Sequence, residues 1–229
     1  MLNFYTPHQS LIMKKALTTI DLISSAKEFC SLYSKKYFAE FFGVTDGKAI
    51  GTLVEHLYKD FLIKHYELTI GNSASGLDLP SVNTDIKVTS IKQPQSSCPF
   101  KDSKQKIYGL GYNLIVFVYE KYDDQQAKRG MLNFVSCSFI PANRTADYQM
   151  TTALRRIIAN NGNEDDIFAF LSDHKVPADD VTLINMSKQI LNCPPEIGYL
   201  TISNALQWRL QYGRVVAMTE SKDDIVKII

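Results

Sequence analysis

Apolar residues recur at helical spacing in several parts of the chain, and two apolar runs near its middle are typical of strands. The strongest helical stripe covers residues 48–66, where apolar side chains repeat at intervals of three and four. Residues 113–120 are almost continuously β-branched or aromatic, which predicts a strand buried on both faces, and residues 131–140 predict its neighbour. We also expect a strand over residues 67–70 and helices over residues 8–42, 145–159, 164–171, 181–191 and 203–211.

This order of elements predicts an α/β fold in which helices flank a central mixed β-sheet. The 229 residues fit one domain with a substantial core. Within it we expect an N-terminal helical element over residues 1–46, a core over residues 47–140 and a mainly helical C-terminal part over residues 141–229.

A short polar hairpin is predicted between the helix at 48–66 and the strand at 113–120. Residues 77–79 and 85–90 have strand character, and residues 80–83 favour a turn. With the turn centred between residues 81 and 82, pairing places Asp78 opposite Asp85, and Lys87 shares their face. Opposed carboxylates destabilise a sheet unless a cation lies between them, so the cluster predicts a divalent metal site. The alternative is a hairpin whose charged face is merely solvated.

Asp78, followed by Asp85-Ile86-Lys87 on the next strand, resembles the PD-(D/E)xK nuclease motif, with Leu77 in place of the proline. The closest functional group is the Type II restriction endonucleases. The resemblance implies Mg²⁺-dependent, sequence-specific hydrolysis of phosphodiester bonds in double-stranded DNA, a homodimer, and a cognate DNA methyltransferase in the same system. By matching position, Asp78 and Asp85 bind the metal, and Lys87 positions or activates the attacking water.

Glu55 lies on the helix that precedes the hairpin. In several nucleases of this type an acid on that helix reaches the metal, so the resemblance makes Glu55 a candidate catalytic and metal-binding residue. The alternative is an exposed pair with Lys59, four residues later, in the favourable Glu-before-Lys order. The sequence leaves both interpretations open.

The polar segment over residues 89–101 leaves the hairpin directly, and Pro94 and Pro99 within it argue against regular structure. Its side chains can donate and accept hydrogen bonds, which suits contact with base edges and phosphates, although it could also be an ordinary loop. Ser103 is expected to cap a short helix that carries Gln105 and Lys106 over the cleft. The DNA-binding candidates are Lys92, Gln93, Gln95, Ser96, Ser97, Lys101, Lys104, Gln105 and Lys106.

Charge and composition agree with a nucleic-acid enzyme. The net charge is only +1, but residues 87–130 hold eight Lys and Arg against four Asp and Glu, which places the positive excess beside the proposed carboxylates. The four cysteines form no C-x-x-C pair, which argues against a zinc ribbon or a disulfide framework. With no apolar run of 18 residues and no signal-like N-terminus, we expect a cytoplasmic protein without membrane association.

Two other functions fit the same hairpin. One is a DNA repair or recombination nuclease that uses the same site on damaged or branched DNA. The other is a non-catalytic DNA-binding module that has kept the fold, although the complete set of two acids and a lysine argues against it.

Overall fold

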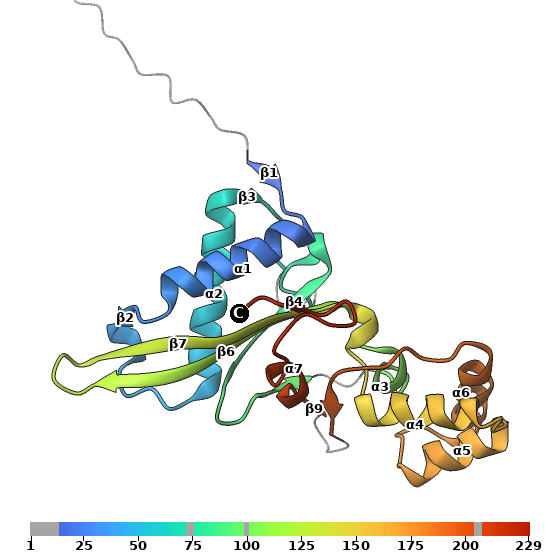
Figure 1. The fold of residues 1–229 in the computed structure, drawn as a ribbon. Helices are drawn as coiled ribbons and strands as arrows, with labels where there is room; N and C mark the ends of the chain where they lie inside the picture. The colour runs from blue at the N-terminus through green and yellow to red at the C-terminus, as the bar shows by residue number, and fades with distance from the viewer. Residues whose placement is uncertain (1–13, 72–75, 99–100, 204–207) are drawn as a thin grey trace, which may run out of the picture.

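A mixed five-stranded sheet forms the centre of the computed structural model, which describes residues 14–71, 76–98, 101–203 and 208–229 (Figure 1). Its strands follow the order β10 (Val226–Lys227), β7 (Arg129–Ile140), β6 (Asn113–Asp124) and β4 (Thr84–Ser90), and β2 (Tyr37–Phe38) also pairs with β7. Strand β4 is parallel to β6, whereas β6 and β7 are antiparallel. This sheet and its flanking helices confirm the predicted fold class.

Helices α1 (Thr19–Tyr33) and α2 (Gly47–His65) pack on one face of the sheet. Helix α1 begins with a capping box, in which Thr18 and Asp21 satisfy each other's backbone amides. Phe29 of α1 and Tyr58 of α2 pack against each other with ring centroids 5.0 Å apart, and each lies against Phe117 of β6 at 5.7 and 4.9 Å. This aromatic contact fixes both helices to the sheet.

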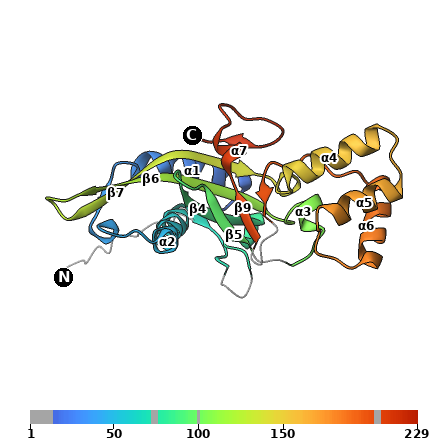
Figure 2. The same cartoon turned by 90° about the horizontal axis from the view of Figure 1, so that it is seen from below.

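A smaller antiparallel sheet covers the opposite face, in the order β5 (Gln95–Cys98), β9 (Trp208–Gln211) and β8 (Thr201–Ile202). Figure 2 shows β5 and β9 side by side near β4, with the short helix α7 (Gly213–Val216) close by. Strand β6 separates the two cores: Ile115, Phe117 and Tyr119 face the helices, whereas the alternate residues face the small sheet. Burial on both faces explains the continuous apolar run of this strand.

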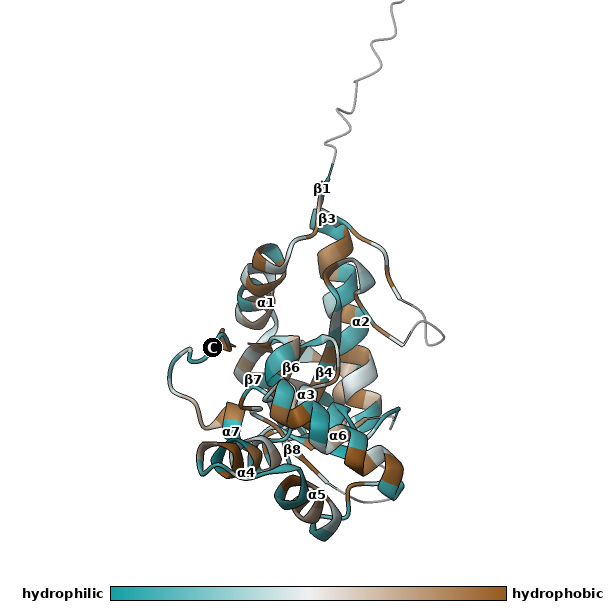
Figure 3. Cartoon of the chain, turned by 90° about the vertical axis from the view of Figure 1, so that its right-hand side faces the viewer, coloured by the Kyte–Doolittle hydropathy of each residue, from teal (hydrophilic) through white to brown (hydrophobic). Residues whose placement is uncertain are grey.

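A helical part lies beyond the small sheet. It comprises α3 (Gln105–Tyr108), α4 (Tyr148–Ala159), α5 (Glu164–Asp173) and α6 (Asp180–Asn192), which share a third apolar cluster. Figure 3 shows α4, α5 and α6 on the opposite side of the sheet from α1 and α2. Asp147 caps α4 through Met150 N at 2.9 Å and accepts a hydrogen bond from Ile202 N at 2.7 Å, so this buried carboxylate joins the helical part to β8. Among the described residues, no helix combines the length and apolar character needed to cross a membrane.

Two expectations of secondary structure in the small sheet are wrong. Residues 208–211 form strand β9 instead of the end of a helix, and residues 95–98 form β5 instead of an irregular loop. Each strand is stabilised by pairing with the other, across more than a hundred residues of sequence. Pro94 precedes β5 rather than interrupting it, so it removes no hydrogen bond from its ladder, and Pro99 lies outside the described residues.

The remaining expectations differ mainly in length. Of the helix expected over residues 8–42, α1 covers 19–33, and residues 8–13 lie outside the described residues. The strand expected over 67–70 is only β3 (Tyr66–Glu67), which pairs with β1 (Lys15–Ala16). The helix over 48–66, the two central strands and the helices around 145–159, 164–171 and 181–191 are confirmed.

Candidate active site

The hairpin has the predicted register but a different turn. Leu79 and Thr84 exchange two backbone hydrogen bonds, at 3.0 and 3.1 Å, as pairing about the midpoint of residues 81 and 82 requires. The turn is a single 3₁₀ turn, η2 (Pro80–Val82), that ends at Asn83 in the left-handed conformation with φ 47°. The segment before the turn forms only this one bridge, so the expected strand over 77–79 is absent.

Asp78 and Asp85 meet at the start of β4. Their side chains share a hydrogen bond, and Asp78 Oδ2 also accepts one from Ile86 N at 2.9 Å. Lys87 Nζ lies 2.6 Å from Asp85 Oδ2. Ile86 points to the other face, where it is buried against the α1 and α2 core. The two acids and the lysine that the motif indicates are therefore brought together.

Lys59 is the residue of this cluster that the sequence did not single out for chemistry. Its ammonium lies 2.6 Å from Glu55 Oε1 and 2.7 Å from Asp78 Oδ1, and its side chain is 11% exposed. The pair that we considered as an alternative for Glu55 does form, but it is not an isolated surface pair, because Lys59 joins Glu55 to Asp78. The sequence feature that could have pointed to Lys59 is its spacing of four residues from Glu55, beside the apolar stripe of the same helix.

Burial and the close contact of the two carboxylates separate their pKa values. Burial and the neighbouring Asp78 outweigh the attraction of Lys87 and raise the pKa of Asp85 to about 6. Burial also disfavours the Asp78 carboxylate, but hydrogen bonds from Asp85, Lys59 and the Ile86 amide lower its pKa to about 2. At Lys59, burial disfavours the ammonium, but its hydrogen bonds to Asp78 and Glu55 outweigh burial and raise its pKa. Near neutral pH the Lys59 ammonium is therefore charged and the Asp78 carboxyl is ionised. Asp85 becomes ionised as the pH rises above about 6.

These residues line a cleft of about 460 Å³ between α2 and the start of β4. Lys101 and Tyr112 also line the cleft, and burial raises the pKa of Tyr112. Within the described part of the chain, no three His, Cys, Asp or Glu side chains come together as a metal site. Glu55 lines the same cleft and is paired with Lys59, and the carboxylates in direct contact are the pair of Asp78 and Asp85. This pair fits Mg²⁺, which is commonly held by one or two carboxylates and keeps water or phosphate oxygens as its other ligands.

The DNA-binding candidates fall into three groups. Lys101 lines the cleft, Lys92 and Lys104 are exposed, and Gln93 is exposed in the turn before β5. Three lie on β5, where Ser97 is exposed, Gln95 is half-buried, and Ser96 Oγ lies 2.5 Å from the hydroxyl of buried Tyr212. Gln105 and Lys106 are on α3.

The expected placement of α3 is wrong in two respects. Lys106 is only 5% exposed and does not line the cleft, and its burial lowers its pKa. Ser103 does not cap the helix, because its hydroxyl donates to the Pro177 carbonyl; Asp102 instead accepts from Lys104 N at 2.8 Å. Helices α4, α5 and α6 share an apolar cluster with α3, and this packing buries Ser103 and Lys106, which local sequence does not reveal.

Comparison with known proteins gives a match over nearly the whole chain. The family described as "Type II restriction enzyme NspV" matches residues 16–227. The Type II restriction enzyme NspV from Nostoc sp. (strain ATCC 29411 / PCC 7524) is 48% identical over 219 residues, which cover 96% of this chain and 97% of that protein. No solved structure matches this chain. The similarity therefore includes the sheet, the cleft and the helical part together.

Proposed function

The chain belongs to the NspV family of type II restriction enzymes, and we propose that it hydrolyses double-stranded DNA in the cleft around Asp78, Asp85 and Lys87. The family membership confirms the resemblance to Type II restriction endonucleases. The observation that supports the site is the contact of two carboxylates, one of them 2.6 Å from the Lys87 ammonium, at the wall of an open cleft.

Asp78 and Asp85 would hold Mg²⁺ at this site. A bound metal ion polarises the scissile phosphate and lowers the pKa of a water molecule. The hydrogen bond from Ile86 N and the ammonium of Lys59 hold the Asp78 carboxylate in place, so this ligand is oriented before DNA arrives. Glu55 would act through Lys59, or through a water on the metal, since Lys59 lies between it and Asp78.

The lysines of the cleft would bind the phosphates of the DNA backbone. Lys87 is held by Asp85 and faces the cleft, where its ammonium can orient the attacking water and stabilise negative charge on the phosphate in the transition state. Lys101, at the cleft wall, can hold a neighbouring phosphate. Of the remaining candidates, we retain those of β5 and its preceding turn, together with Lys92 and Lys104, and we leave out buried Lys106.

We further propose that the enzyme acts as a homodimer and that a DNA methyltransferase of the same specificity accompanies it. Two active sites related by a two-fold axis suit the cutting of both strands of a symmetric sequence. Each subunit would be a single endonuclease domain, since β2 from the N-terminal element and β10 from the C-terminal part both pair with β7 of the core.

Cleavage of unmethylated plasmid DNA with Mg²⁺ or with EDTA tests the site. We expect discrete fragments only with Mg²⁺, and a loss of rate of at least about a hundredfold in Asp85→Asn and Lys87→Ala. Lys188→Ala, at an exposed lysine of α6, is the matched control and should cut normally. Full cleavage by both site variants would rule out this cleft, whereas DNA binding without cleavage by the wild type would favour the binding-module alternative.

A further inference from the structure

The small sheet formed by β5, β9 and β8 has one apolar and one polar face. Trp208 and Leu210 of β9 are buried in the core, while Arg209 and Gln211, which alternate with them, are exposed. The polar face was not expected from the sequence, because residues 203–211 were predicted to be helical. It is formed by side chains that all donate or accept hydrogen bonds.

The strand register arranges this polar face in two rows. Gln211 lies between Gln95 on one side and Thr201 on the other. In the next row, Arg209 lies beside Ser97. Within the described part of the chain, no carboxylate pairs with the Arg209 guanidinium, so its charge is available to a partner.

The small sheet that carries this face lies next to the cleft. Strand β5 follows β4 after a short turn, and Thr89 of β4 bonds to both backbone groups of Gln95, at 3.1 and 3.0 Å. At the other end of β5, Cys98 Sγ lies 4.0 Å from the hydroxyl of Tyr112, which lines the cleft. The Ser97–Arg209 row is thus only one residue along the strands from a contact with the active site.

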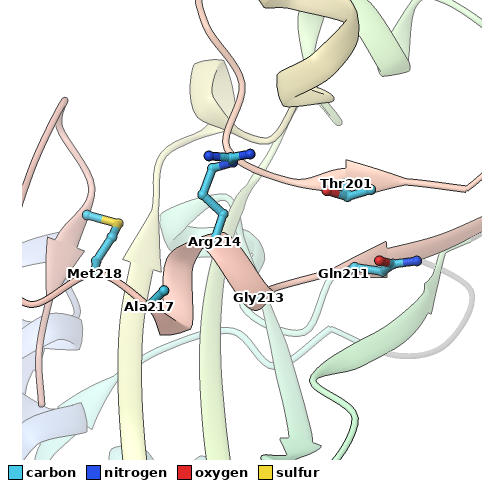
Figure 4. Close-up of a pocket in the computed structure, with 6 residues that line it drawn as sticks. All are labelled: Thr201, Gln211, Gly213, Arg214, Ala217 and Met218. Carbon is cyan, nitrogen blue, oxygen red and sulfur yellow. The ribbon is translucent and has the colours of Figure 1, made fainter.

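A basic pocket borders the far end of the face. Figure 4 shows Thr201, Gln211 and Arg214 around this pocket, which has a volume of about 380 Å³. The Arg214 guanidinium lies 3.4 Å from the ring centroid of Tyr148 on α4. This cation–π contact holds the side chain at the border of the polar face.

Building on the proposed function, we propose that Gln211 and Arg209 read base edges of the DNA target, and that Arg214 binds a phosphate beside them. A two-stranded β-ribbon fits the major groove, where a glutamine can pair with adenine and an arginine with guanine. Both side chains project from β9, which packs on the core through Trp208 and Leu210. Charge favours the same partner, since neither Arg209 nor Arg214 forms an ion pair with a described carboxylate.

The test compares cleavage of a duplex that carries the recognition sequence, mapped from wild-type fragments, with duplexes that differ from it by one base pair. We expect Gln211→Ala and Arg209→Ala each to lower kcat/KM on the cognate duplex by about tenfold to a hundredfold, and to lose discrimination at one or two neighbouring positions. Gln211→Glu replaces an amide donor by a carboxylate and should change which base is preferred there. Arg214→Ala should weaken cleavage of all duplexes alike and reduce the dependence of binding on salt.

Gln189→Ala and Arg155→Ala, at exposed positions of α6 and α4, are the matched controls and should keep wild-type discrimination. Melting curves identify any variant that fails to fold, and Gln211→Glu offers a second test at the same position. If the wild type cuts but the β9 variants discriminate as it does, the inference about β9 is wrong and the active site still stands. If the wild type does not cut DNA at all, the proposed function itself fails.

Discussion

Lys59 offers the sharpest test of how the cleft is held together. Its ammonium contacts both Glu55 and Asp78, at 2.6 and 2.7 Å. In Lys59→Met the stem of the side chain remains, but two partly buried carboxylates lose their cation and lie close to a third, Asp85. Breaking a fully buried ion pair costs about 3–5 kcal/mol. The side chains of Glu55 and Asp78 are 28% and 19% exposed, so water compensates part of that loss. We expect Lys59→Met to lower the free energy of unfolding by about 2 kcal/mol.

This loss should depend on pH in a defined direction. The hydrogen bond from Lys59 helps to lower the pKa of Asp78 to about 2, below its ordinary value near 3.8. A lowered acid pKa stabilises the folded state above the unfolded pKa, and this contribution disappears as pH falls toward the folded value. The difference in unfolding free energy between the wild type and Lys59→Met should therefore be largest near pH 7 and should shrink toward pH 3.

Urea denaturation of the metal-free proteins across this pH range measures the difference. Lys64→Met, at an exposed lysine of the same helix, is the matched control and should change stability by no more than about 0.5 kcal/mol at either pH. An equal loss from Lys59→Met at pH 7 and pH 3 would refute the electrostatic explanation, since it would mean that packing of the stem, and not the ammonium, supports the cleft.

Other predictions concern the metal and the helical part. Burial and Asp78 raise the pKa of Asp85 to about 6, so Mg²⁺ should raise the melting temperature clearly at pH 8 and much less below pH 6, where a proton competes with the metal. An equal rise in melting temperature at both pH values, or the same rise in Asp85→Asn, would contradict this. A hundredfold excess of Mg²⁺ over its Kd should add about 2.7 kcal/mol of stability that EDTA removes. Asp147→Ala leaves the buried amides of Met150 and Ile202 without their acceptor and should cost about 2–4 kcal/mol by urea denaturation, whereas Asp165→Ala, at an exposed acid of α5, should cost well under 1 kcal/mol.

Local sequence was sufficient to predict the register of the hairpin that carries Asp78, Asp85 and Lys87. The two-residue period of a strand places Asp85 and Lys87 together, and the turn residues fix Asp78 beside them. These are short-range relations, and the observed pairing of Leu79 with Thr84 agrees with them. The long apolar run of β6 was equally informative, because burial on both faces leaves no other composition for a central strand.

Long-range contacts account for what the sequence did not reveal. Trp208 and Leu210 alternate with Arg209 and Gln211, a strand pattern only four residues long that is lost within a stretch that favours helix. Its partner β5 is more than a hundred residues away. The burial of Lys106 likewise depends on the packing of distant helices, which no local pattern of charge or spacing could indicate.

The position of β6 between two apolar clusters has a consequence for the way the molecule opens. Its alternate side chains belong to different cores, so neither core can separate from the sheet without exposing this strand. The amides at its centre should consequently be among the slowest in the protein to exchange with deuterium, at rates set by global unfolding. Since β4 pairs with β6 along its whole length, the backbone that carries Asp85 and Lys87 should share this protection, and the proposed active site should keep its structure until global unfolding.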